Sequence, residues 1–183
     1  MNQATRDAIK TTRERLAEKY PHYAELAPPE RRLLCMAYLA DQVKVREVGG
    51  NNHGRWVGIL LDTVGLDEGY AWCAAAMTFA SMVAEAPHPL RSEGYNPAAV
   101  VGWRKWAEEK GHLIASPSRG SICMHKTTAT QGHIGVCVLA VAPNVRTIEG
   151  NTSSGESGSQ TDGGGLFRRT RKPSYWSWGF ADV

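Results

Sequence analysis

The sequence lacks the features that define several common protein classes. Its 183 residues contain no internal repeat, and the longest apolar run, residues 134–142, is far shorter than the roughly 20 residues of a membrane-spanning helix. Residues 1–15 are polar and charged, so we expect no secretory signal peptide. The net charge of +3 is too small to indicate a nucleic-acid partner. The remaining class is an ordinary globular protein without a membrane span.

Cysteine is scarce and widely spaced. The sequence has no Cys-x-x-Cys pair, and its four cysteines are Cys35, Cys73, Cys123 and Cys137. We interpret them as free thiols rather than as a disulfide framework. A zinc site made from Cys123, His125, His133 and Cys137 is an alternative, but structural zinc usually uses more closely spaced ligand pairs. The sequence also lacks a calcium-binding loop, and we expect no metal and no cofactor.

Helical patterns come first along the chain and strand patterns follow. Residues 3–20 predict a weakly amphipathic helix in a solvated N-terminal arm, residues 1–28, and a partner-binding helix is the alternative. Residues 29–183 predict a single domain. Further helices are expected over residues 28–48, 56–65, 72–85 and 96–111. Strands are expected over residues 121–125, 133–141, 145–149 and 166–170, with a mobile Gly/Ser-rich loop and candidate lid over residues 150–165. This order indicates an α+β fold.

Cys73 opens the helix expected over residues 72–85. The first N–H groups of a helix have no partners within the helix, and together with the helix dipole they favour an anion. A cysteine at this position is stabilised as the thiolate, which is the nucleophilic form. Cys73 is therefore a candidate nucleophile, and a small buried core residue is the alternative.

His133 begins the apolar strand expected over residues 133–141, where an imidazole can act as a general base near neutral pH. If the following hairpin is symmetric about Pro143, position 137 lies opposite Glu149 and position 135 opposite Asn151. His133, Glu149 and Asn151 then project from one face of the sheet. An acid or amide beside an imidazole fixes its tautomer and stabilises the imidazolium. The sequence leaves open which of the two has this role.

Other side chains are accessory or alternative candidates. Tyr70 and Trp72 flank Cys73 and, with His53, are candidate residues of a substrate cleft; core packing is the alternative for Trp72. His53, in a Gly/Asn-rich turn, and His125, at a strand end, are alternative bases.

Three short segments together resemble the CHAP family of cysteine amidohydrolases and peptidases. They are Trp72-Cys73-Ala74, Gly132-His133-Ile134-Gly135 and Glu149-Gly150-Asn151, and their order and spacing are similar to those of the family over about residues 30–170. Residues 47–52 and 117–122 resemble a phage-associated subgroup. Two positions depart from the family pattern: Ala71 stands where proline is common, and Ser121 stands where an acid often follows glycine.

The resemblance implies a papain-like α+β fold, with helices packed on an antiparallel sheet and the nucleophile at a helix N-terminus. It implies a peptidoglycan hydrolase that cleaves an amide bond, in a stem or cross-bridge peptide or at the N-acetylmuramoyl-L-alanine link. Cys73 would be the nucleophile and His133 the base, oriented by Glu149 with Asn151 assisting or sharing that role.

The resemblance also implies partners and a place of action. A phage endolysin would leave the host cytoplasm through a holin, and a virion-associated lysin would be carried on the particle. Bacterial peptidoglycan is the expected substrate, and phage tail or virion proteins are further expected partners. The alternatives are a non-catalytic phage tail adaptor that retains the fold and an amidase with a cytoplasmic or toxin-type substrate.

Overall fold

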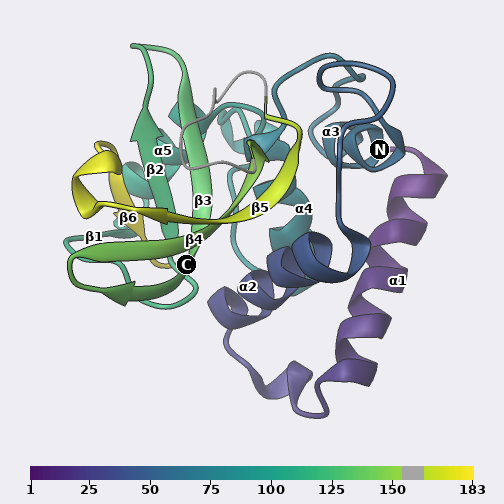
Figure 1. Ribbon diagram of the computed structural model, residues 1–183, viewed down its shortest axis with the longest axis horizontal. Coiled ribbons are helices and arrows are strands. Elements are labelled where there is room, and N and C mark those ends of the chain that lie inside the picture. Colours follow the sequence, from purple (N-terminus) through teal and green to yellow (C-terminus); the bar gives the residue numbers. More distant parts are fainter. Residues whose placement is uncertain (154–162) are drawn as a thin grey trace.

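The computed structural model describes residues 1–153 and 163–183, and a helical layer lies beside an antiparallel sheet (Figure 1). The helices are α1 (Gln3–Lys19), α2 (Pro28–Tyr38), α3 (Arg55–Asp62), α4 (Cys73–Ala84) and α5 (Val100–Glu109). The strands are β1 (Leu113–Ile114), β2 (Ile122–Lys126), β3 (Gly132–Val141), β4 (Asn144–Thr152), β5 (Gly165–Arg171) and β6 (Gly179–Ala181). They lie in the order β1-β6-β2-β3-β4-β5, with antiparallel neighbours. The α+β class expected from the sequence is confirmed.

The helix α4 lies at the centre of the fold, between the sheet and the other helices (Figure 1). Every residue of α4 except Met82 is buried. A helix that is apolar on all sides is stable only when it is surrounded by other elements, and α4 packs against α1, α2 and α3 on one side and β3 and β4 on the other. This packing brings the first residue of α4 close to the sheet.

The helix α1 is part of the helical layer, so the expectation of a solvated arm is wrong. It packs against α2, α3 and α4. Leu16 is fully buried in the main core, and Thr5 and Thr12 are buried at two other positions along the helix. Arg13 donates a hydrogen bond of 2.8 Å to the backbone oxygen of Met82 at the end of α4. Two of the three buried residues of α1 are threonines, which explains why its hydropathy pattern is weak.

The second helix ends earlier than the sequence pattern suggests. The expected helix continues to Gly49, whereas α2 ends at Tyr38 and is followed by one π-helical turn, Leu39–Val43. Lys44 then adopts the left-handed conformation, with φ of 56°, and ends the helical path. The chain continues past the outer edge of β5, where the N–H of Leu166 donates to the oxygen of Val45 at 3.1 Å.

The β3–β4 hairpin has a different register from the symmetric one expected. Gly135 lies opposite Glu149 instead of Asn151, and Cys137 lies opposite Thr147 instead of Glu149. The turn is one residue shorter than expected, because Val141 pairs with Asn144. The irregularity between Cys137 and Leu139 shifts the pairing by one further residue. The total displacement is two residues, and side chains alternate with a period of two. Glu149 therefore keeps the face on which it was expected.

The sheet contributes to two separate apolar clusters. Ile122, Met124, Ile134, Val136, Ile148 and Leu166 join the main core with the helices. Cys123, Cys137, Val145, Trp176 and Phe180 form a second cluster. Within the expected loop 150–165, residues 150–152 belong to β4, and most of the remainder, residues 154–162, lies outside the described residues.

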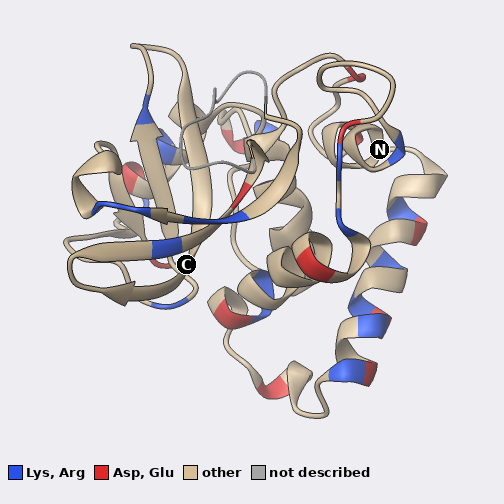
Figure 2. Cartoon of the chain, viewed as in Figure 1, with Lys and Arg blue, Asp and Glu red and all other residues tan. Residues whose placement is uncertain are grey.

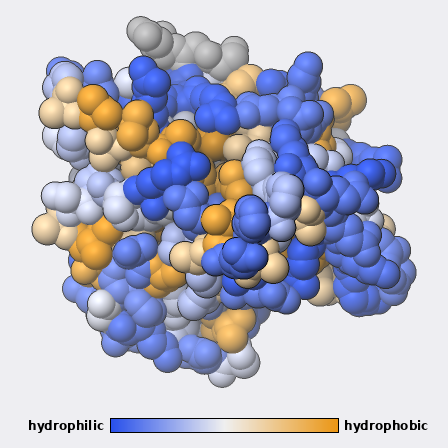
Figure 3. Space-filling view, turned by 90° about the horizontal axis from the view of Figure 1, so that it is seen from below, coloured by the Kyte–Doolittle hydropathy of each residue, from blue (hydrophilic) through white to orange (hydrophobic). Residues whose placement is uncertain are grey.

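Charge and hydropathy are unevenly distributed over the surface. Basic residues follow one another along β5 (Figure 2). The face seen from below is hydrophilic over the α1 side and carries separate apolar patches over the sheet side (Figure 3). Among the described residues, no helix is long and apolar enough to cross a membrane.

Candidate functional site

The thiol of Cys73 is the first side chain of α4. The preceding residue, Trp72, makes no capping hydrogen bond with its side chain, so the first N–H groups of the helix can face a bound anion. Cys73 is 7% exposed and lines a cavity of about 190 Å³. The thiol is thus held by the core while one side meets open space.

His133 and Glu149 form a buried pair beside this helix end. His133 Nε2 lies 2.9 Å from Glu149 Oε2, and the two side chains are only 1% and 0% exposed. Gly135 makes this contact possible, because a Cβ atom there would lie 2.8 Å from Cγ of Glu149. The glycine lets the carboxylate reach across β3 to the imidazole two residues away.

Electrostatic interactions keep both members of this pair charged at neutral pH. Burial disfavours the imidazolium, but the interactions with Cys73 and Glu149 outweigh burial and raise the pKa of His133 to about 9. Burial alone would raise the pKa of Glu149, but hydrogen bonds from His133 and Arg171 outweigh it and lower this pKa to about 2. Because Nε2 faces Glu149, Nδ1 is the ring nitrogen left for the thiol of Cys73.

Arg171 and Thr147, which the sequence analysis did not single out, complete the surroundings of the carboxylate. Arg171 donates to Glu149 through Nη2 at 2.7 Å and Nε at 3.1 Å, and Thr147 donates through Oγ1 at 2.5 Å. Such a two-pronged guanidinium contact fixes the plane of a carboxylate. For Arg171 the only sequence signal was the cluster of basic residues within 168–172, and it does not say which β4 residue they meet.

The imidazole also has an aromatic neighbour, Trp176, near the C-terminal end of the chain. The rings of Trp176 and His133 are nearly parallel, with an interplanar angle of 16° and centroids 6.4 Å apart. Trp176 belongs to the second apolar cluster, so this packing ties the orientation of the imidazole to the sheet core.

Asn151 does not share the contact with His133 among the interactions of the described residues. It lies at an irregularity of the β4–β5 pairing and has φ of 51°. When the side-chain amide of Asn151 is oriented with its nitrogen toward the acceptors, that nitrogen lies 3.2 Å from each of three oxygens: Glu47 Oε1, Asn52 Oδ1 and the backbone oxygen of Gly163. Glu149 is therefore the side chain that contacts the imidazole, whereas Asn151 is connected to the loop around Glu47.

The three candidate cleft residues lie in different environments. Trp72 is fully buried, and its Nε1 donates to Glu47 Oε1 at 2.9 Å, so its ring is core and does not line a cleft surface. Tyr70 is 57% exposed. His53 is exposed, and its Nδ1 lies 2.6 Å from the oxygen of Asn51.

Neither alternative base has a carboxylate partner in the described structure. His125 stacks on Tyr175 with centroids 4.1 Å apart, and its Nδ1 contacts the backbone oxygen of that residue. His53 also pairs with a backbone oxygen. No group of three or more His, Cys, Asp or Glu side chains within residues 1–153 and 163–183 is arranged to hold a metal ion.

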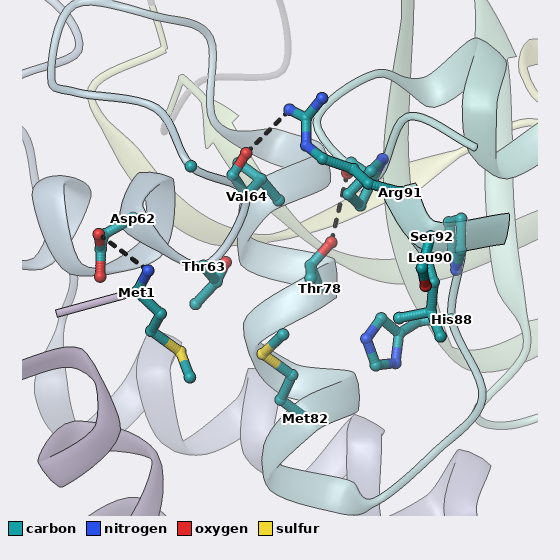
Figure 4. Close-up of a pocket in the computed structure, with 13 residues that line it drawn as sticks. Met1, Asp62, Thr63, Val64, Thr78, Met82, His88, Leu90, Arg91 and Ser92 are labelled. Carbon is teal, nitrogen blue, oxygen red and sulfur yellow. Dashed lines mark hydrogen bonds and ion pairs between the residues drawn. The ribbon is translucent and has the colours of Figure 1, made fainter. Parts of the chain in front are cut away.

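A second cavity, of about 310 Å³, opens beside the C-terminal half of α4 and shares no lining residue with the cavity at Cys73 (Figure 4). Its charged groups are paired locally. Arg91 donates to the oxygen of Val64 at 2.9 Å, and the ammonium group of Met1 lies 3.8 Å from the carboxylate of Asp62. None of the residues that line this cavity is a cysteine, so it offers no thiol nucleophile.

Comparisons with known proteins supply no relative from which a role could be transferred. No protein-family model matches this chain, and searches of the curated proteins and of the solved structures find no significant match.

Proposed function

We propose that the protein is a cysteine peptidase or amidase in which Cys73 is the nucleophile, His133 the general base and acid, and Glu149 the residue that orients and stabilises the imidazolium. The observation that carries this proposal is the buried His133–Glu149 contact of 2.9 Å next to the first residue of α4. A thiol, an imidazole and a carboxylate in this order form the arrangement that activates a nucleophile.

The proposed reaction is acyl transfer to water. The Cys73 thiolate attacks the carbonyl carbon of an amide, and a tetrahedral intermediate forms. His133, protonated at Nδ1, donates that proton to the leaving nitrogen as the C–N bond breaks, which leaves a thioester on Cys73. His133 then takes a proton from water, and the resulting hydroxide attacks the thioester. The C–S bond breaks, the carboxylic acid leaves, and the Cys73 thiolate and the protonated His133 are restored.

The helix end supplies the second requirement of this chemistry. A tetrahedral intermediate carries a negative oxygen, and its stabilisation needs hydrogen-bond donors that are already in position. The backbone N–H groups at the start of α4 meet this need, since Trp72 does not cap them with its side chain. We assign the oxyanion contact to the N–H of Cys73 and its neighbour.

Peptidoglycan is the proposed substrate, and its support comes from the resemblance of three segments to the CHAP family. A papain-like fold agrees with the α+β architecture and with α4 beginning at Cys73. The same resemblance supports a phage endolysin or a virion-associated lysin, which would act on the bacterial cell wall.

The test is hydrolysis of purified bacterial cell walls by the wild type and by Cys73→Ala, measured as the release of new amino termini. Cys35→Ala is the matched control, because Cys35 is a fully buried thiol of α2 in the main core. We expect release by the wild type and the control and none by Cys73→Ala. Equal release by all three proteins would reject the proposal. No release by any of them would favour the adaptor.

The products then identify the bond. A free lactyl carboxyl on muramic acid together with a new alanine amino terminus marks an N-acetylmuramoyl-L-alanine amidase. A new amino terminus within the stem or cross-bridge marks an endopeptidase.

A further inference from the structure

Apart from the reacting thiol of Cys73, the described residues that line the cavity beside it carry no charge. Its walls are formed by Ala71 and Cys73, by residues 98–100 before and at the start of α5, and by Thr127 and residues 130–132 of the β2–β3 turn. The side chains among them are those of alanine, valine, threonine, glutamine and cysteine. At about 190 Å³ the cavity is smaller than the roughly 300–1,000 Å³ of ordinary small-molecule sites. This volume suits one side chain of a substrate.

The wall before α5 is firmly anchored. The helix expected from residue 96 begins only at Val100, since residues 96–99 form a turn in which Asn96 Oδ1 accepts from the N–H of Ala98 at 3.1 Å. The oxygen of Pro97 accepts from Thr78 Oγ1 of α4 at 3.3 Å and from Trp103 Nε1 of α5 at 3.1 Å. The alanines of this turn are thus fixed relative to the helix that carries Cys73.

The opposite wall, the β2–β3 turn, is fixed by its own hydrogen bonds. Thr128 Oγ1 accepts from the N–H groups of Thr130 and Gln131 at 3.3 and 3.0 Å. The oxygen of Gln131 accepts from the N–H of Thr127 at 3.0 Å. The turn leads directly into β3, whose second residue is His133, so the cavity lies between the nucleophile and the segment that carries the base.

We infer that this cavity binds a small, uncharged side chain of the substrate residue next to the cleaved bond and disfavours carboxylate and ammonium side chains. The inference rests on the proposed function, because it takes Cys73 as the reacting group. A charged side chain that enters loses part of its hydration, and apart from the reacting Cys73 the described lining offers no opposite charge in return. The side chains of alanine, serine and threonine lose little hydration free energy on entry, and they fit the cavity volume.

The test uses chloromethyl ketones of short peptides that differ only in the residue bearing the ketone: alanine, glutamate or lysine. In each reaction the Cys73 thiolate displaces chloride and forms a thioether, so the assay needs no turnover. Intact-mass spectrometry followed by peptide mapping gives the rate of alkylation at Cys73. We expect the alanine reagent to react at least about tenfold faster than either charged reagent.

Charge variants of Gln131 give the matched experiment. Gln131→Glu should speed the lysine reagent several-fold relative to the alanine reagent, and Gln131→Lys should do the same for the glutamate reagent. Ala129→Glu is the control, since it adds the same charge to the same turn at a residue that does not line the cavity. It should leave the ratios close to those of the wild type.

The outcomes separate this inference from the proposed function. Equal rates for the three reagents at Cys73 would overturn the inference, and cell-wall hydrolysis would still decide the function. Selective labelling by the alanine reagent without any hydrolysis of cell walls would support the cavity and reject the substrate. Failure of every reagent to label Cys73 would reject both.

Discussion

At the scale of single residues, the candidate site depends on how one carboxylate is held. Glu149 accepts four hydrogen bonds: His133 and Arg171 share Oε2, and Thr147 and Arg171 share Oε1. A carboxylate with this many donors has little freedom to rotate, and its charge is maintained. Because Nε2 of His133 is committed to Glu149, the imidazole presents Nδ1 to Cys73.

The first prediction concerns the variant Glu149→Gln. A carboxamide has nearly the same shape but no charge, so it stabilises the imidazolium less. The pKa of His133, about 9 in the wild type, should fall. The alkaline limb of the pH dependence of kcat/KM should then move to lower pH, with a loss of about 100-fold at neutral pH. The measurement is kcat/KM from about pH 5 to pH 10.

Glu149→Gln must be compared with a compensating double variant, because it leaves the Arg171 guanidinium without its counter-ion. The Arg171 side chain is only 10% exposed. A buried charge that loses its partner costs about 3–5 kcal/mol. The double variant Glu149→Gln/Arg171→Met removes that charge and should recover the melting temperature, while the alkaline limb stays displaced. If the alkaline limb of kcat/KM lies at the same pH in the wild type and in both variants, then the group that titrates in this limb is not His133.

The sequence was sufficient to single out Cys73, His133 and Glu149 because each position has a local signature: a helix start, a strand start and a matching strand parity. Thr147, two residues before Glu149 on β4, shares its face by the same parity. Arg171 has no such signature, because its contact with Glu149 depends on the pairing of β4 with β5, and these strands are separated by a long segment. A sequence pattern gives the faces of β5 but not its register against a distant strand.

At the scale of elements, the β3–β4 hairpin shows which errors in a sequence argument are harmless. The expected register was displaced by two residues, yet His133 and Glu149 still share a face, because side-chain direction repeats every two residues. The argument failed for Asn151 because an irregularity and a φ of 51° interrupt the alternation there. Parity is thus a sound guide where a strand is regular and no guide at an irregularity within it.

The second prediction concerns α1, whose buried face the sequence did not reveal. Leu16 has no exposed surface and belongs to the main core. Leu16→Ala should lower the free energy of unfolding by about 3 kcal/mol, because it removes buried methyl groups and leaves a cavity. Urea denaturation followed by far-UV circular dichroism measures the loss.

The matched control for Leu16→Ala is Lys10→Ala on the same helix, where the side chain is 76% exposed. It should change stability by less than about 0.5 kcal/mol. A denaturation midpoint for Leu16→Ala equal to that of the wild type would mean that α1 folds apart from the rest of the domain.

At the scale of the whole molecule, the candidate site joins the helical layer to the sheet. Cys73 belongs to α4, while His133 and Glu149 belong to β3 and β4. Arg32 of α2 adds a second link, since its buried guanidinium donates to the oxygen of Val183 at 2.8 Å. The charged groups of the site therefore assume their native surroundings only when both layers have packed, and their protonation is linked to folding of the entire chain.

The third prediction follows from this linkage. The pKa of His133 rises from 6.5 to about 9 on folding, so its stabilising contribution is complete below about pH 6.5 and is lost as the pH rises through 9. The pKa of Glu149 falls from 4.5 to about 2, so its contribution is complete above about pH 4.5 and is lost as the pH falls through 2. Each limb should amount to about 3 kcal/mol. Urea denaturation at a series of pH values measures both limbs.

Variants assign each limb to its residue. His133→Gln has no titrating imidazole at the site, so the decline in the free energy of unfolding above about pH 6.5 should be shallower than in the wild type. Glu149→Gln/Arg171→Met lacks the buried carboxylate, so its decline below about pH 4.5 should be shallower, with other carboxylates such as Asp62, whose pKa is also lowered, supplying what remains. If the free energy of unfolding of the wild type and of both variants falls equally above about pH 6.5 and below about pH 4.5, then the His133–Glu149 pair is not the source of either decline.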